Sequence, residues 1–234
     1  MQTKVEKFTP IQGFEQTDYA YFEGRIVWVG DDAAVRHPRN YWTPWQPPAK
    51  TYSAALLQAG AGLCLQQIEK IEEPKGLLAW LVNRALAFPL NHAKPRFDAV
   101  RDALQAKHSK ALQAAALRVL GLGNGLTPSG DDFLGGIFFA YAHACKPYPN
   151  WLAGLPALEA NLREACGTST NQISAALLAS NMAGTSFGEL HDMLDALESN
   201  DSRFIAASVD ALLGVGSSSG ADMLAGLLLA LTLT

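Results

Sequence analysis

The chain has 234 residues, of which 49% are hydrophobic and 17% charged, and its formal net charge is −4 at pH 7. This composition is typical of a compact globular protein with a sizeable core. The 18 Lys and Arg residues are scattered and are outnumbered by 22 Asp and Glu. We therefore expect neither nucleic acid nor an anionic membrane as a partner.

The cysteines and the most apolar runs predict a soluble, cytoplasmic protein. Cys64, Cys145 and Cys166 are odd in number and lie in apolar stretches, so we expect buried free thiols, as in a reducing compartment. The opening residues, MQTKVEKFTP, lack the apolar segment of a signal peptide. Residues 133–145 and 223–233 are apolar but shorter than the ~20 residues that a membrane-spanning helix needs.

Residues 1–48 differ from the rest of the chain and form a β-rich N-terminal segment with a linker. In YAYFEGRIVWVGDDAAV, aromatic and β-branched residues flank a turn at Glu23–Gly24, which predicts a hairpin or two adjoining strands. The following RHPRNYWTPWQPP is too rich in proline for a helix. We expect it to be a linker that packs Trp42 and Trp45 against the main body.

Residues 49–234 are expected to form a helical domain. Segments 51–73 and 75–88 have helix-like composition or apolar spacing, and residues 96–120 predict two helices that are broken near Ser109. Further helices are predicted near 129–145, 151–166, 171–183, 187–198, 202–213 and 219–233. The predicted fold class is therefore α+β, mainly α, with a small β-containing N-terminal part.

One glycine-rich motif occurs twice in the helical part, within residues 121–140 and 214–230. SGDDFLGGIFFA from Ser129 and SGADMLAGLLLA from Ser219 are identical at six of twelve positions, and G-x-G precedes each copy. The repeat predicts two similar corners at which a loop enters a helix. These corners are expected to face each other across a pseudo-symmetric pair of helices.

The residues that both copies share can be explained without a ligand. A serine followed three residues later by Asp132 or Asp222 is the pattern of a capping box at a helix N-terminus. Gly136 and Gly226, within each helix, would allow another backbone to approach closely. The shared positions are therefore interpreted mainly as structural.

The first copy alone contains NGLTP and a second aspartate, Asp131. Its glycines at 121, 123 and 125 allow positive φ angles and expose backbone N–H groups, and such a loop before a helix is an anion site. Asp131 and Asp132 would repel a bare phosphate. A divalent cation such as magnesium, or a ligand with both an amide and an anionic end, would resolve the conflict. Asp131 has no capping role, and we predict that it is the main functional residue.

A third polar cluster, TSTNQIS, begins the next predicted helix. Thr170 and Ser174 would share one helical face and either point into a pocket or bond to their own helix. Ser186 and Glu189 match another capping box. His143, in an apolar run, is expected to be a core residue.

Other chemical classes receive little support. The five histidines lack metal-ligand spacing, and neither a P-loop nor a nucleophile elbow is present. GVGSSSGAD resembles the phosphate loop of galactokinase-type kinases, but it lies near the C-terminus and lacks the strands that surround that loop.

At GLGNGLTPSGDDFLGG the chain resembles a bacterial family of unknown-function domains that includes the AllH-like subunit of oxamate carbamoyltransferase. TSTNQIS and the late GVGSSSGAD agree with the resemblance, although relatives are expected to have a His-Thr pair, as in GHTSG, at the latter. The resemblance covers most of residues 51–234. It implies a carbamoyltransferase subunit of allantoin (ureide) nitrogen catabolism that moves a carbamoyl group between oxamate or oxalurate and phosphate, with carbamoyl phosphate as the other product.

The resemblance implies an anionic or amide-bearing small molecule as substrate and other transferase subunits as partners. Gly123, Gly125 and Thr127 would then hold phosphate or carboxylate, and Asp131 would receive an amide N–H or magnesium. The predicted catalytic residues are Asp131 and Asp132. The predicted substrate-binding residues are Gly123, Asn124, Gly125, Thr127, Ser129, Thr170, Ser174, Ser218 and Ser219.

Three alternatives remain open from the sequence. The chain is either an enzyme subunit that acts on a small carbamoyl or carboxylate compound, which we favour, or a non-catalytic ligand-binding or scaffold subunit. An unrelated small-molecule enzyme, including a magnesium-dependent one, is the third alternative. A corner with closely packing glycines would also suit an interface, and a homo-oligomer is compatible with it.

Overall fold

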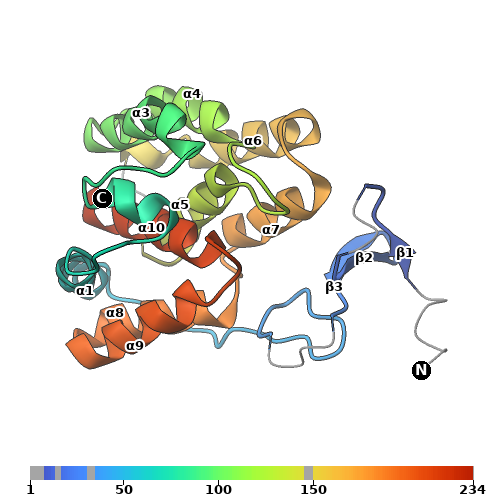
Figure 1. Cartoon of the computed structure of the whole chain (residues 1–234), viewed down its shortest axis with the longest axis horizontal. Coiled ribbons are helices and arrows are strands. Elements are labelled where there is room, and N and C mark those ends of the chain that lie inside the picture. Colours follow the sequence, from blue (N-terminus) through green and yellow to red (C-terminus); the bar gives the residue numbers. More distant parts are fainter. Residues whose placement is uncertain (1–7, 14–16, 31–34, 145–149, 234) are drawn as a thin grey trace.

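The computed structural model describes residues 8–13, 17–30, 35–144 and 150–233. The fold is mainly helical, with a small antiparallel sheet near the N-terminus, which confirms the predicted class (Figure 1). Short 3-10 helices lie at Leu90–Ala93 (η2) and Asn150–Leu152 (η3). The α-helices are α1 (Ala54–Ile68), α2 (Gly76–Leu81), α3 (Lys94–Gln105), α4 (Ser109–Val119), α5 (Ser129–Ala144), α6 (Leu155–Ser169), α7 (Gln172–Met182), α8 (Gly188–Ser199), α9 (Ser202–Leu213) and α10 (Ser219–Leu233).

The helices α5 and α10 pack against each other at the centre of the helical part, and both are apolar and almost entirely buried. Helix α7 packs on α5, while α1 and α2 pack on α10. A Cβ atom on Gly136 would lie 2.0 Å from the carbonyl oxygen of Met223, and one on Gly226 would lie 2.0 Å from that of Phe133. The predicted close approach of two backbones at these glycines is confirmed.

The N-terminal sheet consists of β1 (Thr9–Pro10), β2 (Tyr19–Phe22) and β3 (Arg25–Trp28), in the order β1-β2-β3. The hairpin prediction is confirmed, because β2 pairs antiparallel with β3 around Glu23 and Gly24, which have φ angles of 49° and 73°.

The sheet contacts the helical part through apolar and polar groups. Ile11 and Ile26 form a small buried cluster with Ile173 and Leu177 of α7. In addition, the Arg39 Nε donates a hydrogen bond of 2.9 Å to the Ser180 hydroxyl. These contacts place one end of the hairpin beside α7.

The linker aromatics differ in where they pack. The Trp45 ring lies 5.2 Å from that of His191 in α8, as expected for packing against the main body. Trp42 instead packs edge-on against Phe8 and Tyr41, and its indole N–H donates to the Val29 carbonyl. It therefore contributes to the N-terminal part, because the chain folds back on the sheet before it reaches α1.

The helix predicted over residues 75–88 is wrong in length, since α2 ends at Leu81. Asn83 adopts a left-handed conformation with φ 58°, and the Arg84 side chain donates to the carbonyl of Glu69 just beyond α1. The apolar spacing continues past the point at which the backbone turns away. The predicted break near Ser109 is confirmed, because α3 ends at Gln105 and α4 starts at Ser109.

Two predicted features concern thiols and membrane spans. Cys64 and Cys166 are free and buried, and burial raises their thiol pKa values to about 12 and about 11. Cys145 lies outside the described residues. Within the described ranges, no helix combines the length and the apolar character needed to cross a bilayer.

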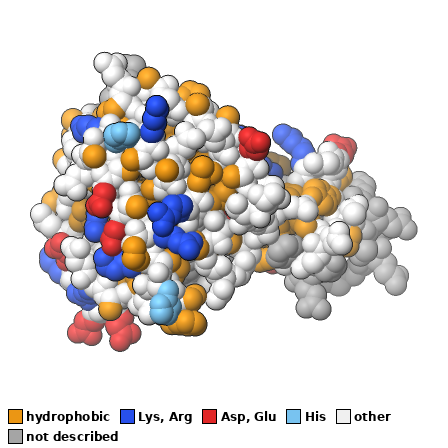
Figure 2. Space-filling view, turned by 90° about the horizontal axis from the view of Figure 1, so that it is seen from above, with side chains coloured by type: hydrophobic (Ala, Val, Ile, Leu, Met, Phe, Trp, Pro, Cys, Tyr) orange, Lys and Arg blue, Asp and Glu red, His pale blue; other side chains and the backbone are white. Residues whose placement is uncertain are grey.

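On the face in Figure 2, acidic and basic side chains are interspersed, without one continuous basic surface.

Candidate functional site

The two motif copies form equivalent corners at the N-termini of α5 and α10. The Gly130 N–H donates to the Leu122 carbonyl at 2.8 Å, and the Gly220 N–H donates to that of Val215 at 3.0 Å. A Cβ atom on Gly130 or on Gly220 would collide with the last turn of the preceding helix, 1.9 Å or 1.7 Å from a carbonyl oxygen. The corners therefore require glycine at the same place for the same reason.

The motif serines do not act as the predicted N-caps. The first carbonyls that accept helical N–H bonds are those of Pro128 and Ser218, one residue earlier than expected. The capping-box prediction is wrong, because each serine turns toward the opposite helix. Ser219 lies beside Asp132, and Ser129 lies beside Asp222.

Asp132 and Asp222 form a buried acidic pair where the two helix N-termini meet. Burial raises the pKa of Asp222 to about 6. Burial also raises the pKa of Asp132 well above its ordinary value, and the nearby negative charge of Asp222 raises it further. The Oδ2 atom of each aspartate is buried without a hydrogen-bond partner in the described protein. Two unsatisfied carboxylate oxygens at one place are unusual in a stable core.

Asp131 has a different environment, although it is adjacent to Asp132. Its Oδ1 accepts a 2.6 Å hydrogen bond from the Gly121 N–H, and its Oδ2 accepts from the hydroxyls of Ser174, at 2.6 Å, and Thr170. Burial raises the pKa of Asp131, and these three donors oppose that rise. The carboxylate thus ties the glycine loop to the start of α7.

The third polar cluster, at the start of α7, also helps to attach the glycine loop to this helix. Thr170 ends α6 in an extended conformation, so it does not share a helical face with Ser174 as predicted. Both hydroxyls donate to Asp131 and neither points into the pocket described below. Asn171 is the N-cap of α7, and its side-chain amide donates to the Leu126 carbonyl at 2.8 Å.

The predicted capping box at Ser186 and Glu189 is wrong. Helix α8 starts one residue later, with Phe187 at its N-cap and no side-chain cap. Arg36 of the linker lies 3.5 Å from Glu189 and 2.5 Å from Asp192, so an ion-pair partner from another segment engages Glu189. His143 is half-buried and its Nε2 hydrogen-bonds with the Gly184 carbonyl at 2.9 Å, as expected for a satisfied histidine.

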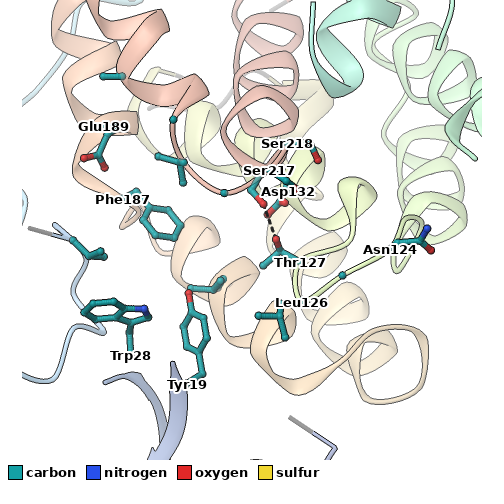
Figure 3. A pocket seen from close by; sticks show the side chains of 18 residues that line it. Tyr19, Trp28, Asn124, Leu126, Thr127, Asp132, Phe187, Glu189, Ser217 and Ser218 are labelled. Atoms are coloured by element: carbon teal, nitrogen blue, oxygen red, sulfur yellow. Dashed lines mark hydrogen bonds between the residues drawn. The ribbon is translucent and has the colours of Figure 1, made fainter. Parts of the chain in front are cut away.

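A pocket of about 600 Å³ lies beside the two corners (Figure 3). Asp132, Thr127 and Ser219 line one side, where the Thr127 and Ser219 hydroxyl oxygens are 2.7 Å apart. The aromatic rings of Tyr19 and Trp28 lie across the pocket from this side (Figure 3). The other lining residues come from the linker, the glycine-rich loop before α5, α7, the start of α8, and the segment from α9 to α10: Val35, Asn124, Gly125, Leu126, Leu177, Phe187, Glu189, Ala211, Gly214, Val215, Gly216, Ser217 and Ser218.

The pocket combines apolar walls with an acidic and hydroxyl-rich end. Its described lining includes the acids Asp132 and Glu189 but no Lys, Arg or His. Burial raises the Tyr19 pKa to about 12, and the charge of Asp132 adds to the effect, so its phenol stays protonated at neutral pH. Such a site favours a ligand that supplies hydrogen-bond donors.

The structure separates the predicted site residues into two groups. Those that line the pocket are Asn124, Gly125, Thr127, Asp132, Ser218 and Ser219. Those outside its lining are Gly123, Ser129, Asp131, Thr170 and Ser174. Gly123 has a φ of 121°, as its loop requires.

Sequence reasoning missed the aromatic wall and Ser217. Tyr19, Trp28 and Phe187 lie on segments far from the motif, and no local pattern links them to it. Only the density of aromatic residues in residues 1–48 was a signal.

The described residues contain no group of three or more His, Cys, Asp or Glu side chains placed to hold a metal ion. Both oxygens of Asp131 already accept hydrogen bonds, which argues against magnesium at that position.

The fold is that of a mainly helical protein with a pocket beside two equivalent helix corners. Residues 119–231, which contain both corners, match the sequence profile of the family described as oxamate carbamoyltransferase subunit AllH. The match confirms the resemblance predicted from the motif. Comparisons with curated proteins and with solved structures gave no match.

Proposed function

We propose that the chain is a subunit of a carbamoyltransferase-type enzyme that acts on oxamate or oxalurate with carbamoyl phosphate in ureide nitrogen catabolism. The small carbamoyl or carboxylate compound binds in the pocket beside Asp132. The observation that carries the proposal is that Asp132, a buried aspartate with one unpartnered carboxyl oxygen, lines a cavity next to the motif that matches the family profile. A family description that names a subunit supports the presence of other chains in the complex.

The pocket's chemistry is compatible with these compounds. Oxamate and carbamoyl phosphate each have an amide and an anionic end. Asp132 is the acceptor for the amide, and the Ser217 hydroxyl is a donor for the anion. A volume of about 600 Å³ exceeds the size of one such molecule, which suits a reaction between two small substrates.

A second candidate is a non-catalytic ligand-binding or scaffold subunit. It is favoured by the lack of a cation in the described lining, because phosphoryl and oxyanion groups normally react beside positive charge or several converging donors. Turnover by the isolated chain distinguishes the two candidates. Activity without partner subunits supports the enzyme, whereas activity only on addition of another subunit, with ligand binding retained, supports the second.

Thermal unfolding of the purified chain tests the pocket. Carbamoyl phosphate, oxamate, oxalurate and phosphate are each added with and without magnesium. A ligand at 100 times its Kd stabilises the folded state by about 2.7 kcal/mol, which corresponds to a Tm increase of roughly 5–10 °C for a chain of this length.

Two variants localise the binding. Ala211 is exposed at the pocket, so Ala211→Trp fills part of it without disturbing the core and should abolish the Tm increase. Ala206→Trp, an exposed position of the same helix outside the lining, is the matched control and should retain it. No Tm increase with any compound, or equal loss in both variants, would contradict the proposal.

A further inference from the structure

The two equivalent corners differ in one respect. Asp222 is covered by α2, whose Leu77 N–H donates a 2.7 Å hydrogen bond to its Oδ1. Gly76 makes this possible, since a Cβ atom there would lie 2.3 Å from the same oxygen. The hydroxyls of Ser129 and Ser218 complete the surroundings of this carboxylate. Asp222 therefore has two hydroxyl groups and one backbone amide around it, although its Oδ2, like that of Asp132, has no hydrogen-bond partner in the described protein.

At Asp132 the backbone amide is missing. The hydroxyls of Ser219 and Thr127 correspond to the two at Asp222, but Asp132 has no counterpart of the Leu77 N–H among the described residues. The pocket occupies the side of Asp132 that no helix covers, whereas α2 covers Asp222. The aspartate is 7% exposed, so little water reaches it.

A bound molecule can take the place at Asp132 that α2 takes at Asp222. A buried carboxyl group with few donors is unfavourable, and the described pocket lining offers no Lys, Arg or His to pair with it. The second acid of the lining, Glu189, adds to the unfavourable potential for an anionic group. A neutral amide N–H is the donor that the same fold uses at the equivalent aspartate.

We propose that Asp132 is a specificity-determining residue whose carboxyl group accepts an N–H from the ligand's amide, in the role that the Leu77 N–H has at Asp222. The inference rests on the proposed function and adds the orientation of the ligand, with its amide toward α5. A site built to accept an N–H rejects analogues that lack it, because the buried acceptor is then left unpaired.

Two pairs of compounds isolate the amide. Oxalate replaces the amide of oxamate by a carboxylate, and acetyl phosphate replaces the amino group of carbamoyl phosphate by a methyl group. The second comparison keeps the charge of the ligand nearly constant. Titration calorimetry on the full chain should give at least about 100-fold weaker binding for the analogue that lacks N–H groups.

Asp132→Ala should remove this preference. The variant is expected to fold, because the Thr127 and Ser219 hydroxyls still hydrogen-bond to each other at 2.7 Å and the deleted side chain opens into the pocket. Asp210→Ala removes an exposed carboxylate of α9 that is outside the pocket lining, and should leave the preference unchanged. It is the matched control.

The outcomes separate the inference from the proposed function. A preference for the amide in either pair that is lost in Asp132→Ala and kept in Asp210→Ala supports the inference. Equal affinities within both pairs overturn the inference, and so does a preference that Asp132→Ala leaves unaffected. In either case the compounds still bind, so the proposed function remains in place. If none of the four compounds binds, the proposed function fails and the inference fails with it.

Discussion

Replacing Gly226 by alanine should destabilise the protein, because this position holds the two central helices at contact distance. The new Cβ would lie 2.0 Å from the Phe133 carbonyl oxygen and 3.1 Å from the Ile137 nitrogen, both of which are backbone atoms of α5. Neither can move aside as a side chain does, so the helices must separate by about 1 Å in a region that is fully buried.

The magnitude follows from two opposing effects. Alanine in place of glycine stabilises a helix by about 1 kcal/mol. Forced overpacking costs about 1–3 kcal/mol, and more where the backbone itself is displaced. We expect a net loss of about 2 kcal/mol in the free energy of unfolding, equal to a Tm decrease of roughly 4–8 °C.

Gly62→Ala is the matched control, because Gly62 lies within α1 and a Cβ atom there would meet nothing within 4 Å. This variant should gain up to about 1 kcal/mol. Urea unfolding followed by circular dichroism measures both changes. If Gly226→Ala were as stable as Gly62→Ala, the reasoning that glycine sets the separation of α5 and α10 would be refuted.

Two further predictions concern the aspartates. Asp131→Ala should lower the free energy of unfolding by about 3 kcal/mol or more, because it leaves the donors of Gly121, Thr170 and Ser174 unpaired. A variant as stable as wild type in urea unfolding would contradict this prediction. For Asp222, burial raises the folded pKa to about 6, above the ordinary 3.8. Burying its charged form therefore costs no folding stability below pH 4. This cost grows as the pH rises and reaches about 3 kcal/mol above pH 6. Asp222→Asn should therefore gain stability relative to wild type between pH 4 and 7, and a difference that does not change with pH would disprove the assignment.

Helix positions were predictable from the sequence because they depend on local signals. The motif copies, Ser109 and the prolines mark where the chain enters helices, and the boundaries of α5, α9 and α10 agree with the prediction. The helix over 75–88 was too long, because its early end depends on Arg84 reaching the end of α1.

The different roles of Asp131 and Asp132 could not be predicted from local sequence signals. Adjacent residues of a helix point about 100° apart, so the direction of each side chain depends on where the helix starts. The serines suggested a start one residue too late, and nothing local revealed that they pair with the opposite helix. The motif located the site, but only the packing of α7 on α5 determined which carboxylate faces the pocket.

The aromatic wall has a consequence for the composition of the pocket. Tyr19 and Trp28 belong to the hairpin, outside the segment that matches the family profile, yet they line the same pocket as Asp132. The duplicated corners thus supply the aspartate and hydroxyl groups, while a separate part of the chain supplies the facing aromatic rings. Changes confined to the hairpin would alter the shape and polarity of the pocket while the duplicated corners stayed the same.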